Sequence, residues 1–269
     1  MPFLFYQKIN LPMNAKLTII TSVYKGKDFI EGFLEDITSQ GAFGLAELYM
    51  LDANSPDGEY KVIQEFMKKH KNIRYERLPE DPGLYGCWNH MIKNSNSPYI
   101  TNANLDDRLI GGCLDRCIRE LDSNLDVDLV YGFNLVATEP NTTEQKIKEE
   151  NQNSIVRALQ RGKVQMFPCL DFSLTNLLSN NSPHNHPMWR RSLHDRYGYF
   201  STDYVSASDW EFWLRCAFGG ASMKMINDIL GIYYYNPSGI STDSKNMNRN
   251  VSEVQEIASI YKKKLQERN

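Results

Sequence analysis

Apolar segments of strand length alternate with helical patterns in the N-terminal part of this chain, and this alternation constrains the fold most strongly. Four segments are typical of buried strands: Leu17 to Val23, Leu48 to Asp52, Ile73 to Leu78 and Tyr99 to Asn104. Between them, apolar residues recur at helical spacing: Phe29, Phe33, Leu34 and Ile37; Val62, Ile63, Phe66 and Met67; Leu84, Trp88, Met91 and Ile92. Strands that alternate with helices predict an α/β fold with a mostly parallel central sheet flanked by helices.

The rest of the chain is less regular. The predicted elements are a helix over 109–121, a strand over 129–133, a helix over 211–217 and a strand over 229–235. The polar stretch 138–153 predicts a mobile loop or the start of a surface helix. Residues 251–265 form an amphipathic pattern and predict a C-terminal helical tail. We therefore expect one domain over 1–242 and a helix within 243–269 that packs on it.

Composition excludes several classes of protein. With 41% apolar and 12% aromatic residues among 269, the chain is typical of a folded globular protein. A net charge of −3 gives no support for nucleic acid as a partner. The five cysteines include no Cys-x-x-Cys pair, which favours a reducing compartment, and Cys113 and Cys117 are interpreted as packing residues.

No apolar run approaches the roughly 20 residues needed to cross a bilayer. The segment Pro2 to Tyr6 is too short for a signal peptide and follows no basic region. We expect a cytoplasmic protein. The run Lys262-Lys263-Lys264 in the amphipathic tail leaves peripheral contact with the inner face of a membrane as an alternative to simple packing.

Polar residues stand at the carboxyl ends of three of the predicted strands. They are Thr21-Ser22-Val23-Tyr24, Asp52-Ala53-Asn54-Ser55 and Asn104-Leu105-Asp106-Asp107. In open parallel sheets, ligands bind at this edge. The convergence of three such ends predicts a ligand site there.

Asp106 and Asp107 are adjacent carboxylates that follow an apolar segment. Their repulsion is costly unless a cation or hydrogen bonds offset it. Mg²⁺ or Mn²⁺ that carries a diphosphate is one solution, because these ions prefer oxygen ligands. A helix cap is the alternative, although one carboxylate suffices for a cap. The pair favours a nucleotide-dependent enzyme.

Two further acidic residues have both a ligand-binding and a structural interpretation. Asp52 closes an apolar strand and needs a partner, such as a nucleobase imide or a ribose hydroxyl, or the turn that follows it. Asp209 precedes the predicted helix over 211–217. It is a candidate catalytic base, or a residue that caps this helix.

Taken in order, these motifs resemble those of family 2 glycosyltransferases with a GT-A fold. That family has a strand with a "V-Y-N"-like turn, a "D-x-x-S-x-D-G" segment, a helix with an Asn, a "D-x-D-D" metal motif, and an acidic residue before "W-L-R". The matching stretches here are Thr18 to Lys25, Asp52 to Gly58, Gly83 to Asn89, Asn104 to Asp107, and Asp209 with Trp213 to Arg215. The resemblance spans residues 16 to 242.

The resemblance implies a Rossmann-like GT-A fold and an inverting transfer of sugar from a nucleoside-diphosphate sugar, most often UDP-linked. Asp106 would hold Mn²⁺ or Mg²⁺, Asp107 would bind the donor sugar or orient the metal shell, and Asp209 would be the catalytic base. Nucleotide contacts are implied for Thr21, Val23, Tyr24, Asp52, Asn89 and Asn104. The implied acceptor is a glycan or a lipid-linked molecule, in surface polysaccharide or glycan assembly.

Two positions depart from the family pattern. Asn104 replaces the first acidic residue of the metal motif, and Asn236 replaces a late histidine. Both favour an alternative function, a non-catalytic GT-A-like module that binds a sugar nucleotide or a partner protein. Asp106, Asp107 and Asp209 oppose it. A nucleotidyltransferase is less consistent, because Tyr24 to Lys27 is not a Gly-rich basic loop.

The segment His184-Asn185-His186-Pro187-Met188-Trp189 precedes the Asp209 motif. Its position predicts an acceptor pocket in which His186 contributes and Trp189 stacks on a sugar. The alternative is a buried tryptophan with ordinary hydrogen-bonded histidines. Nothing in the sequence indicates an oligomeric state.

Overall fold

The computed structural model describes residues 15–268, and the prediction about the segment 2–6 lies outside them. Within this part a nine-stranded sheet forms, with β7 paired to β6 beside the strand order β3-β2-β1-β4-β8-β6-β9-β5. The strands are β1 Leu17–Val23, β2 Ala46–Asp52, β3 Ile73–Arg77, β4 Tyr99–Asn102, β5 Arg108–Leu109, β6 Leu129–Ala137, β7 Gln165–Met166, β8 Met188–Arg190 and β9 Met223–Tyr234.

Parallel pairing organises the half of the sheet that was predicted from the alternating pattern. β1 pairs in parallel with both β2 and β4, and β2 pairs in parallel with β3. The short strand β8 is antiparallel to β4 and β6, and β6 and β9 form the longest pairing, which is again parallel. The predicted α/β fold with a mostly parallel sheet is confirmed.

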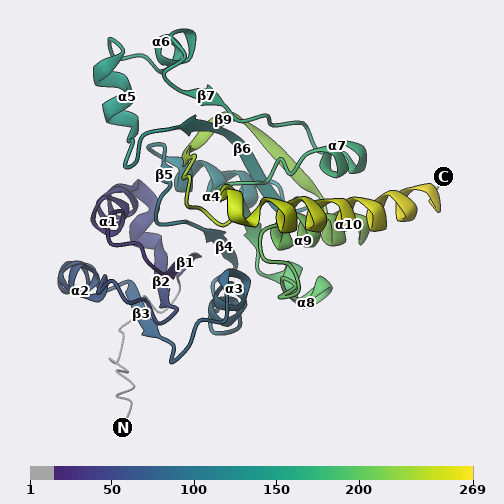
Figure 1. Cartoon of the computed structure of the whole chain (residues 1–269), viewed down its shortest axis with the longest axis horizontal. Coiled ribbons are helices and arrows are strands. Elements are labelled where there is room, and N and C mark those ends of the chain that lie inside the picture. The colour runs from purple at the N-terminus through teal and green to yellow at the C-terminus, as the bar shows by residue number, and fades with distance from the viewer. Residues whose placement is uncertain (1–14, 269) are drawn as a thin grey trace.

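Helices cover both faces of the sheet (Figure 1). They are α1 Ile30–Ser39, α2 Tyr60–Lys69, α3 Leu84–Lys93, α4 Cys113–Ser123, α5 Glu144–Glu150, α6 Ile155–Gln160, α7 Leu174–Ser179, α8 Ser192–Tyr197, α9 Ser208–Phe218 and α10 Met247–Gln266, with two 3₁₀ turns at Gly41–Leu45 and Ser244–Asn246. Successive residues of β1 explain the two layers, because side chains alternate across a strand. Ile19 packs with α1, α2 and α4, whereas Ile20 packs with α3, α7, α9 and α10.

The elements of the second half differ in extent from the prediction. The predicted helix over 109–121 begins only at Cys113, because Leu109 belongs to β5 and Gly112 turns the chain with a φ of +76°. β9 starts at Met223 rather than 229. Its pairing with β6 is irregular near Gly132 and Phe133, and this irregularity interrupts the strand pattern before Ile229. The stretch 138–153 contains helix α5, capped by the side chain of Thr143.

Six short helices and strands of the described residues were not predicted: α6, α7, α8, β5, β7 and β8. Their apolar patterns are too short to stand out from the surrounding loops. α7 did carry a signal, because Ser173 caps it and Leu177 and Leu178 are its buried residues. Cys113 and Cys117 are buried on α4, in agreement with a packing role.

The C-terminal helix α10 lies along α9 (Figure 1). Ile257 and Tyr261 are its buried apolar residues, and they belong to the core cluster of α3 and α9. Among residues 15–268, no helix combines the length and the apolar character that crossing a membrane requires. The division of the chain at residue 242 stays a prediction.

Asp36 fastens α1 to β5, because its Oδ2 accepts the N–H of Leu109 at 2.8 Å. Burial raises the pKa of Asp36 from 3.8 to about 6, although that hydrogen bond and Arg108 act in the opposite direction. Protonated Asp36 therefore contributes stability that is fully present below pH 3.8 and is lost as the pH rises through about 6.

We expect the variant Asp36→Asn to gain stability relative to the wild type as the pH rises from about 4 to about 7.5. Asparagine keeps an acceptor for the Leu109 N–H but cannot ionise. A shift of two pKa units corresponds to at most about 3 kcal/mol. Urea unfolding of both proteins at the two pH values measures the difference, and parallel pH profiles would contradict this expectation.

Candidate active site at the carboxyl edge of the sheet

The carboxyl ends of β1, β2 and β4 meet at one edge of the sheet. Val23 stands opposite Asp52, and Ile20 stands opposite Asn102. Beyond the strands, the N–H of Ala53 donates to the carbonyl oxygen of Val23 at 3.0 Å. The three predicted polar segments are therefore neighbours, as expected of parallel strands that end together.

Asp52 is fully buried, and protein groups contact both of its carboxylate oxygens. Oδ1 accepts the N–H of Ser55 at 2.7 Å. Oδ2 accepts the hydroxyl of Tyr75 at 2.5 Å and Nη1 of Arg77 at 2.7 Å. This geometry matches the turn that the sequence left open as an alternative. Arg77 is half-exposed whereas Asp52 is buried, so a ligand can reach this group through the guanidinium of Arg77.

A buried carboxylate, Glu59, ties the loop after β1 to the turn after β2. Its Oε1 accepts the N–H of Gly26 at 2.7 Å and the hydroxyl of Ser55 at 2.8 Å. Ser55 Oγ in turn accepts the N–H of Lys25 at 2.9 Å. These bonds hold the two loops together at the carboxyl edge of the sheet.

The predicted nucleotide contacts at the end of β1 divide by exposure. Thr21 and Val23 are fully buried, so neither side chain has surface available for a ligand in this conformation. Tyr24 is 43% exposed, with the ammonium of Lys25 5.1 Å from the centre of its ring. Of these three predicted contacts, Tyr24 is therefore the one whose side chain a ligand can reach.

Asn89, a further predicted nucleotide contact, lies on α3 and bridges to another loop. Its Nδ2 donates to the carbonyl oxygen of Phe200 at 2.8 Å, and its Oδ1 accepts the N–H of Phe200 at 3.0 Å. Both amide atoms thus serve the packing of α3. The nucleotide contact of Asn89 stays a prediction.

Asp107 is buried within a set of hydrogen-bond donors. Its Oδ1 accepts the N–H of Tyr234 at 3.0 Å. Its Oδ2 accepts Nδ2 of Asn104 at 2.9 Å and Nδ2 of Asn185 at 3.1 Å. Burial and the neighbouring Asp106 raise the pKa of Asp107 above its usual range. Asn104 therefore supports Asp107 directly.

Asp106 is partly exposed beside this buried group. Its Oδ2 accepts Nδ2 of Asn236 at 3.0 Å, so the residue that replaces the family histidine lies at the predicted metal position. Within the described residues, no hydrogen bond reaches Oδ1 of Asp106. That oxygen is free for an external ligand.

Asp209 lies in the first turn of α9 and is held by two side chains. Its Oδ1 accepts the hydroxyl of Tyr85 at 3.1 Å, and its Oδ2 accepts Nδ2 of Asn181 at 2.9 Å. Burial and the charge of Asp209 raise the pKa of Tyr85, so this hydroxyl stays protonated and remains a donor. The predicted helix cap is not formed by Asp209, since no side chain caps α9.

One short loop connects the two acidic groups. Asn181 contacts Asp209, and four residues later Asn185 contacts Asp107. Between them, His184 packs against Tyr233, with ring centres 5.0 Å apart. The loop therefore brings the candidate base and the candidate metal carboxylates to one side of the sheet edge.

The sequence of the chain matches an established family of enzymes. The profile of glycosyl transferase family 2 matches residues 18–196, which is more than half of the chain.

The chain belongs to glycosyl transferase family 2.

Solved structures share the fold of this family 2 chain. S. aureus TarS, residues 1–349 in complex with UDP-GlcNAc, is 15% identical, with a TM-score of 0.69 over 91% of this chain and 66% of that one. The mannosyltransferase PcManGT from Pyrobaculum calidifontis, in complex with GDP-Man and Mn²⁺, is 15% identical, with a TM-score of 0.60 over 88% and 63% of the two chains.

A curated relative is similar over a shorter stretch. The teichoic acid poly(glycerol phosphate) polymerase of Staphylococcus epidermidis is 33% identical over 95 residues, which are 35% of this chain and 13% of that protein. The family 2 chain thus spans less than two thirds of the length of each of these proteins.

The structure corrects the predicted acceptor pocket. Trp189 is fully buried in β8 and donates from Nε1 to Nε2 of His194 at 3.0 Å, so it cannot stack on a sugar. His186 is 2% exposed and pairs with Oδ1 of Asn134 at 2.9 Å. Burial lowers the pKa of His186 to about 3, so the ring is neutral. Trp189 and His186 thus match the alternative of a buried tryptophan with an ordinary hydrogen-bonded histidine.

The residues of this family 2 site fit a divalent cation only when a substrate completes its shell. No group of three His, Cys, Asp or Glu side chains within residues 15–268 forms a metal cage. Mg²⁺ commonly binds through one or two carboxylates together with substrate phosphates. The free Oδ1 of Asp106 is a ligand of that kind, whereas Asp107 is saturated by protein donors.

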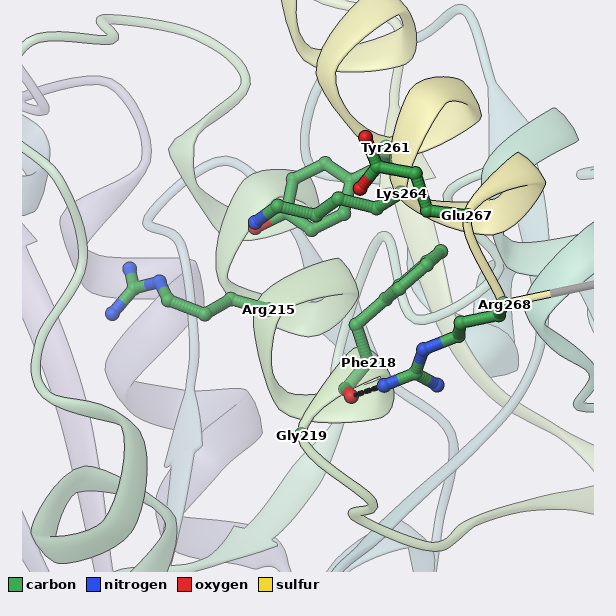
Figure 2. Close-up of a pocket in the computed structure, with 7 residues that line it drawn as sticks. All are labelled: Arg215, Phe218, Gly219, Tyr261, Lys264, Glu267 and Arg268. Carbon is green, nitrogen blue, oxygen red and sulfur yellow. Dashed lines mark hydrogen bonds between the residues drawn. The ribbon is translucent and has the colours of Figure 1, made fainter.

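A cavity of about 360 Å³ lies elsewhere, between the C-terminal ends of α9 and α10. Figure 2 shows Arg268 bonded to the carbonyl oxygen of Phe218, with Tyr261 and Lys264 reaching in from α10. α9 has 11 residues. At about 1.5 Å per residue, its two ends are about 15 Å apart. The cavity is thus separate from the Asp209 site.

Several residues of the site were missed in the sequence: Tyr75, Arg77, Tyr85, Asn181 and Asn185. Each contacts a predicted aspartate from a segment far away in the chain. Asn185 carried a weak signal, because it lies within the His-Asn-His stretch. Tyr85 also carried one, because it lies within the stretch Gly83 to Asn89 that resembles the family pattern. Tyr75, Arg77 and Asn181 carried none, since single residues of these types are common in any strand or loop.

Proposed function

We propose that this chain transfers a sugar from a nucleoside-diphosphate sugar, such as a UDP-sugar, to an acceptor hydroxyl with inversion at the anomeric carbon. The observation that carries the proposal is the loop that links Asp209 to Asp107 through Asn181 and Asn185. Membership of family 2 supports it, as do fold neighbours in complex with UDP-GlcNAc and GDP-Man.

In the proposed reaction Asp209 is the general base. It accepts the proton of the acceptor hydroxyl while that oxygen forms a bond to the anomeric carbon. The bond from the same carbon to the diphosphate oxygen breaks, and the nucleoside diphosphate leaves. Attack on the face opposite the leaving group inverts the configuration. Tyr85 and Asn181 orient the carboxylate through the hydrogen bonds at its two oxygens.

Asp106 would hold Mn²⁺ or Mg²⁺ together with the diphosphate of the donor, while Asn104 and Asn185 fix Asp107 beside it. When bound, such an ion offsets the negative charge that develops on the leaving diphosphate. Asp107 would face the donor sugar or orient the ligands of the ion. The ion in complex with the neighbour PcManGT, Mn²⁺, supports this assignment.

The nucleotide would lie over the loops that Glu59 and Ser55 hold together. Tyr24 and the Asp52–Arg77 pair would lie next to its nucleobase or ribose. The acceptor would be a glycan or a lipid-linked molecule in the assembly of a surface polymer, which the teichoic acid relative supports. We place the reaction in the cytoplasm, with at most peripheral contact at the membrane, and we assign no nucleic-acid partner.

One observation favours a second function, a non-catalytic module that binds a sugar nucleotide or a partner protein. Asn236 donates to Oδ2 of Asp106, so an amide occupies one oxygen of the proposed metal ligand. A module of this kind would bind nucleotide without a metal requirement and without turnover.

Calorimetry tests the proposal through metal-dependent nucleotide binding. We expect wild-type protein to bind UDP or GDP more tightly with Mn²⁺ than without it, and Asp106→Ala to lose this gain. The loss is expected to be roughly 100-fold in affinity, because charge stabilisation by a metal amounts to several kcal/mol. The exposed Asp126→Ala is the matched control and keeps the wild-type behaviour. Equal affinity with and without metal favours a module that binds a sugar nucleotide, and no nucleotide binding under either condition contradicts the transferase and favours a module that binds a partner protein.

A further inference from the structure

One carboxylate of the C-terminal helix binds three consecutive backbone amides next to the candidate base. Glu253 on α10 is 7% exposed. Its Oε1 accepts the N–H of Val205 at 2.9 Å, and its Oε2 accepts the N–H groups of Ser206 at 2.9 Å and Ala207 at 3.2 Å. The hydroxyl of Ser206 donates to the same Oε2 at 2.9 Å. Glu253 thus holds a whole segment rather than a single group.

The segment held by Glu253 leads directly into Asp209. α9 begins at Ser208, with Ala207 as the residue before it and Asp209 in its first turn. Glu253 binds the N–H of the N-cap residue Ala207 and of the two residues before it. Its negative charge near the start of a helix is favourable. The contact therefore lies on the backbone that immediately precedes α9 and Asp209.

Glu253 is held on α10, whose side chains contact α9. Ile257 and Tyr261 follow it on the same face and are buried. The hydroxyl of Tyr261 donates to Oε1 of Glu211 at 2.8 Å, in the first turn of α9. Arg249, one turn before Glu253, places Nε 3.8 Å from its Oε1. A rigid helix therefore carries the carboxylate to the segment.

Two other roles for Glu253 do not fit its contacts. As a general base it would need a free oxygen at the site, but both of its oxygens accept backbone N–H groups. As part of a fold-stabilising contact alone it would resemble the Tyr261–Glu211 bond, which also joins α10 to α9 but is made to a side chain and not to the backbone before Asp209. What distinguishes Glu253 is that its partners lie immediately before Asp209.

We propose that Glu253 is a positioning residue for Asp209, which makes α10 a working part of the active site. The inference rests on the proposed function, because it assigns the base role to Asp209. Glu253 acts on the reaction only through the placement of the segment 205–207, and it does not touch the donor or the acceptor.

The test uses the full chain and measures nucleotide release from UDP-GlcNAc and GDP-Man, with water or an added glycan as the acceptor. We expect Glu253→Gln to lower kcat roughly tenfold or more with little change in KM, because small displacements of a catalytic group have large effects on rate. Tyr261→Phe, which removes the hydrogen bond from α10 to Glu211 of α9, should keep the wild-type kcat.

The same substitution in an Asp209→Asn background separates positioning from general destabilisation. If Glu253 acts through Asp209, Glu253→Gln causes no further loss once the base is absent. An equal loss in both backgrounds, or a wild-type kcat in folded Glu253→Gln, overturns the proposal. Should Glu253→Gln fail to fold, Ser206→Ala removes one of the four hydrogen bonds and is expected to lower kcat to a smaller extent.

Amide hydrogen exchange is a second measurement that needs no turnover. We expect faster exchange at Val205, Ser206 and Ala207 in Glu253→Gln, with exchange in β1 and α3 unchanged. Unchanged exchange at these three amides overturns the proposal. A wild-type chain without turnover of any sugar nucleotide instead contradicts the proposed function, and the role of Glu253 in catalysis with it.

Discussion

Replacing Asp209 with asparagine is expected to lower kcat roughly 10²–10⁴-fold, the usual contribution of a general base. The amide has nearly the shape of the carboxylate and can still accept the hydroxyl of Tyr85, so the loss is one of proton acceptance. Nucleotide binding should be unchanged, since Asp209 is assigned to the acceptor. Initial rates of nucleotide release and calorimetric titration with UDP measure the two effects separately.

Asp203→Asn is the control for this substitution. Asp203 lies in the same segment, is exposed and bonds only to nearby Ser201. We expect it to keep the wild-type rate. If Asp209→Asn turned over as fast as this control, another residue would have to be the base, and the assignment of Asp209 would be wrong.

Replacing Trp189 with alanine is expected to destabilise the fold by about 3–5 kcal/mol, as for other large buried aromatic residues. The indole is fully buried, with its ring centre 5.2 Å from that of Trp213, and its N–H is bonded to His194. Its removal leaves a cavity and an unpaired buried nitrogen on His194. The free energy of unfolding from urea titration measures this loss.

A milder substitution distinguishes a core residue from a sugar-stacking platform. Trp189→Phe keeps an aromatic ring in the core and should be less destabilised, with kcat and KM close to those of the wild type. A raised KM for the acceptor in folded Trp189→Phe would instead support the platform. Leu125→Ala, at a side chain that is 82% exposed, is the control and should leave stability unchanged.

The β1–α3 half of the fold could be predicted closely because its signals are local. β1 has the predicted bounds, Leu17–Val23, and the helical spacing of Phe33, Leu34 and Ile37 lies within α1. Short elements were missed for a physical reason: β8 has three residues and β5 has two, so neither shows a period. Their extended form is imposed by pairing with β4 and β9.

The candidate site could be predicted only in part. The aspartates at strand ends were found because ionised groups at the end of apolar strands require partners. Which partners they have could not be found, since each lies far away in the chain. Asp52 bonds to Tyr75 and Arg77 on the neighbouring strand β3, and Asp209 bonds to Tyr85 on α3.

Exposure was the other property that sequence could not supply. Trp189 and His186 have the residue types of an acceptor pocket, yet β8 lies between β4 and β6 and buries them. A tryptophan in a loop and one in a central strand have the same side chain, and only the position of the strand in the sheet decides which surface is free.

The sequence by itself determined the alternating α/β order, the sheet edge at which the carboxylates gather, and an amphipathic helix at the C-terminus, because periodicity and residue type are local properties. The tertiary structure alone decided that Asn181 and Asn185 join the two acidic groups and that Glu253 lies against the segment before Asp209. Those contacts depend on the packing of α10 on α9 and of one loop across the sheet edge. They join residues far apart in the chain, and no local sequence pattern shows that such residues are close in space.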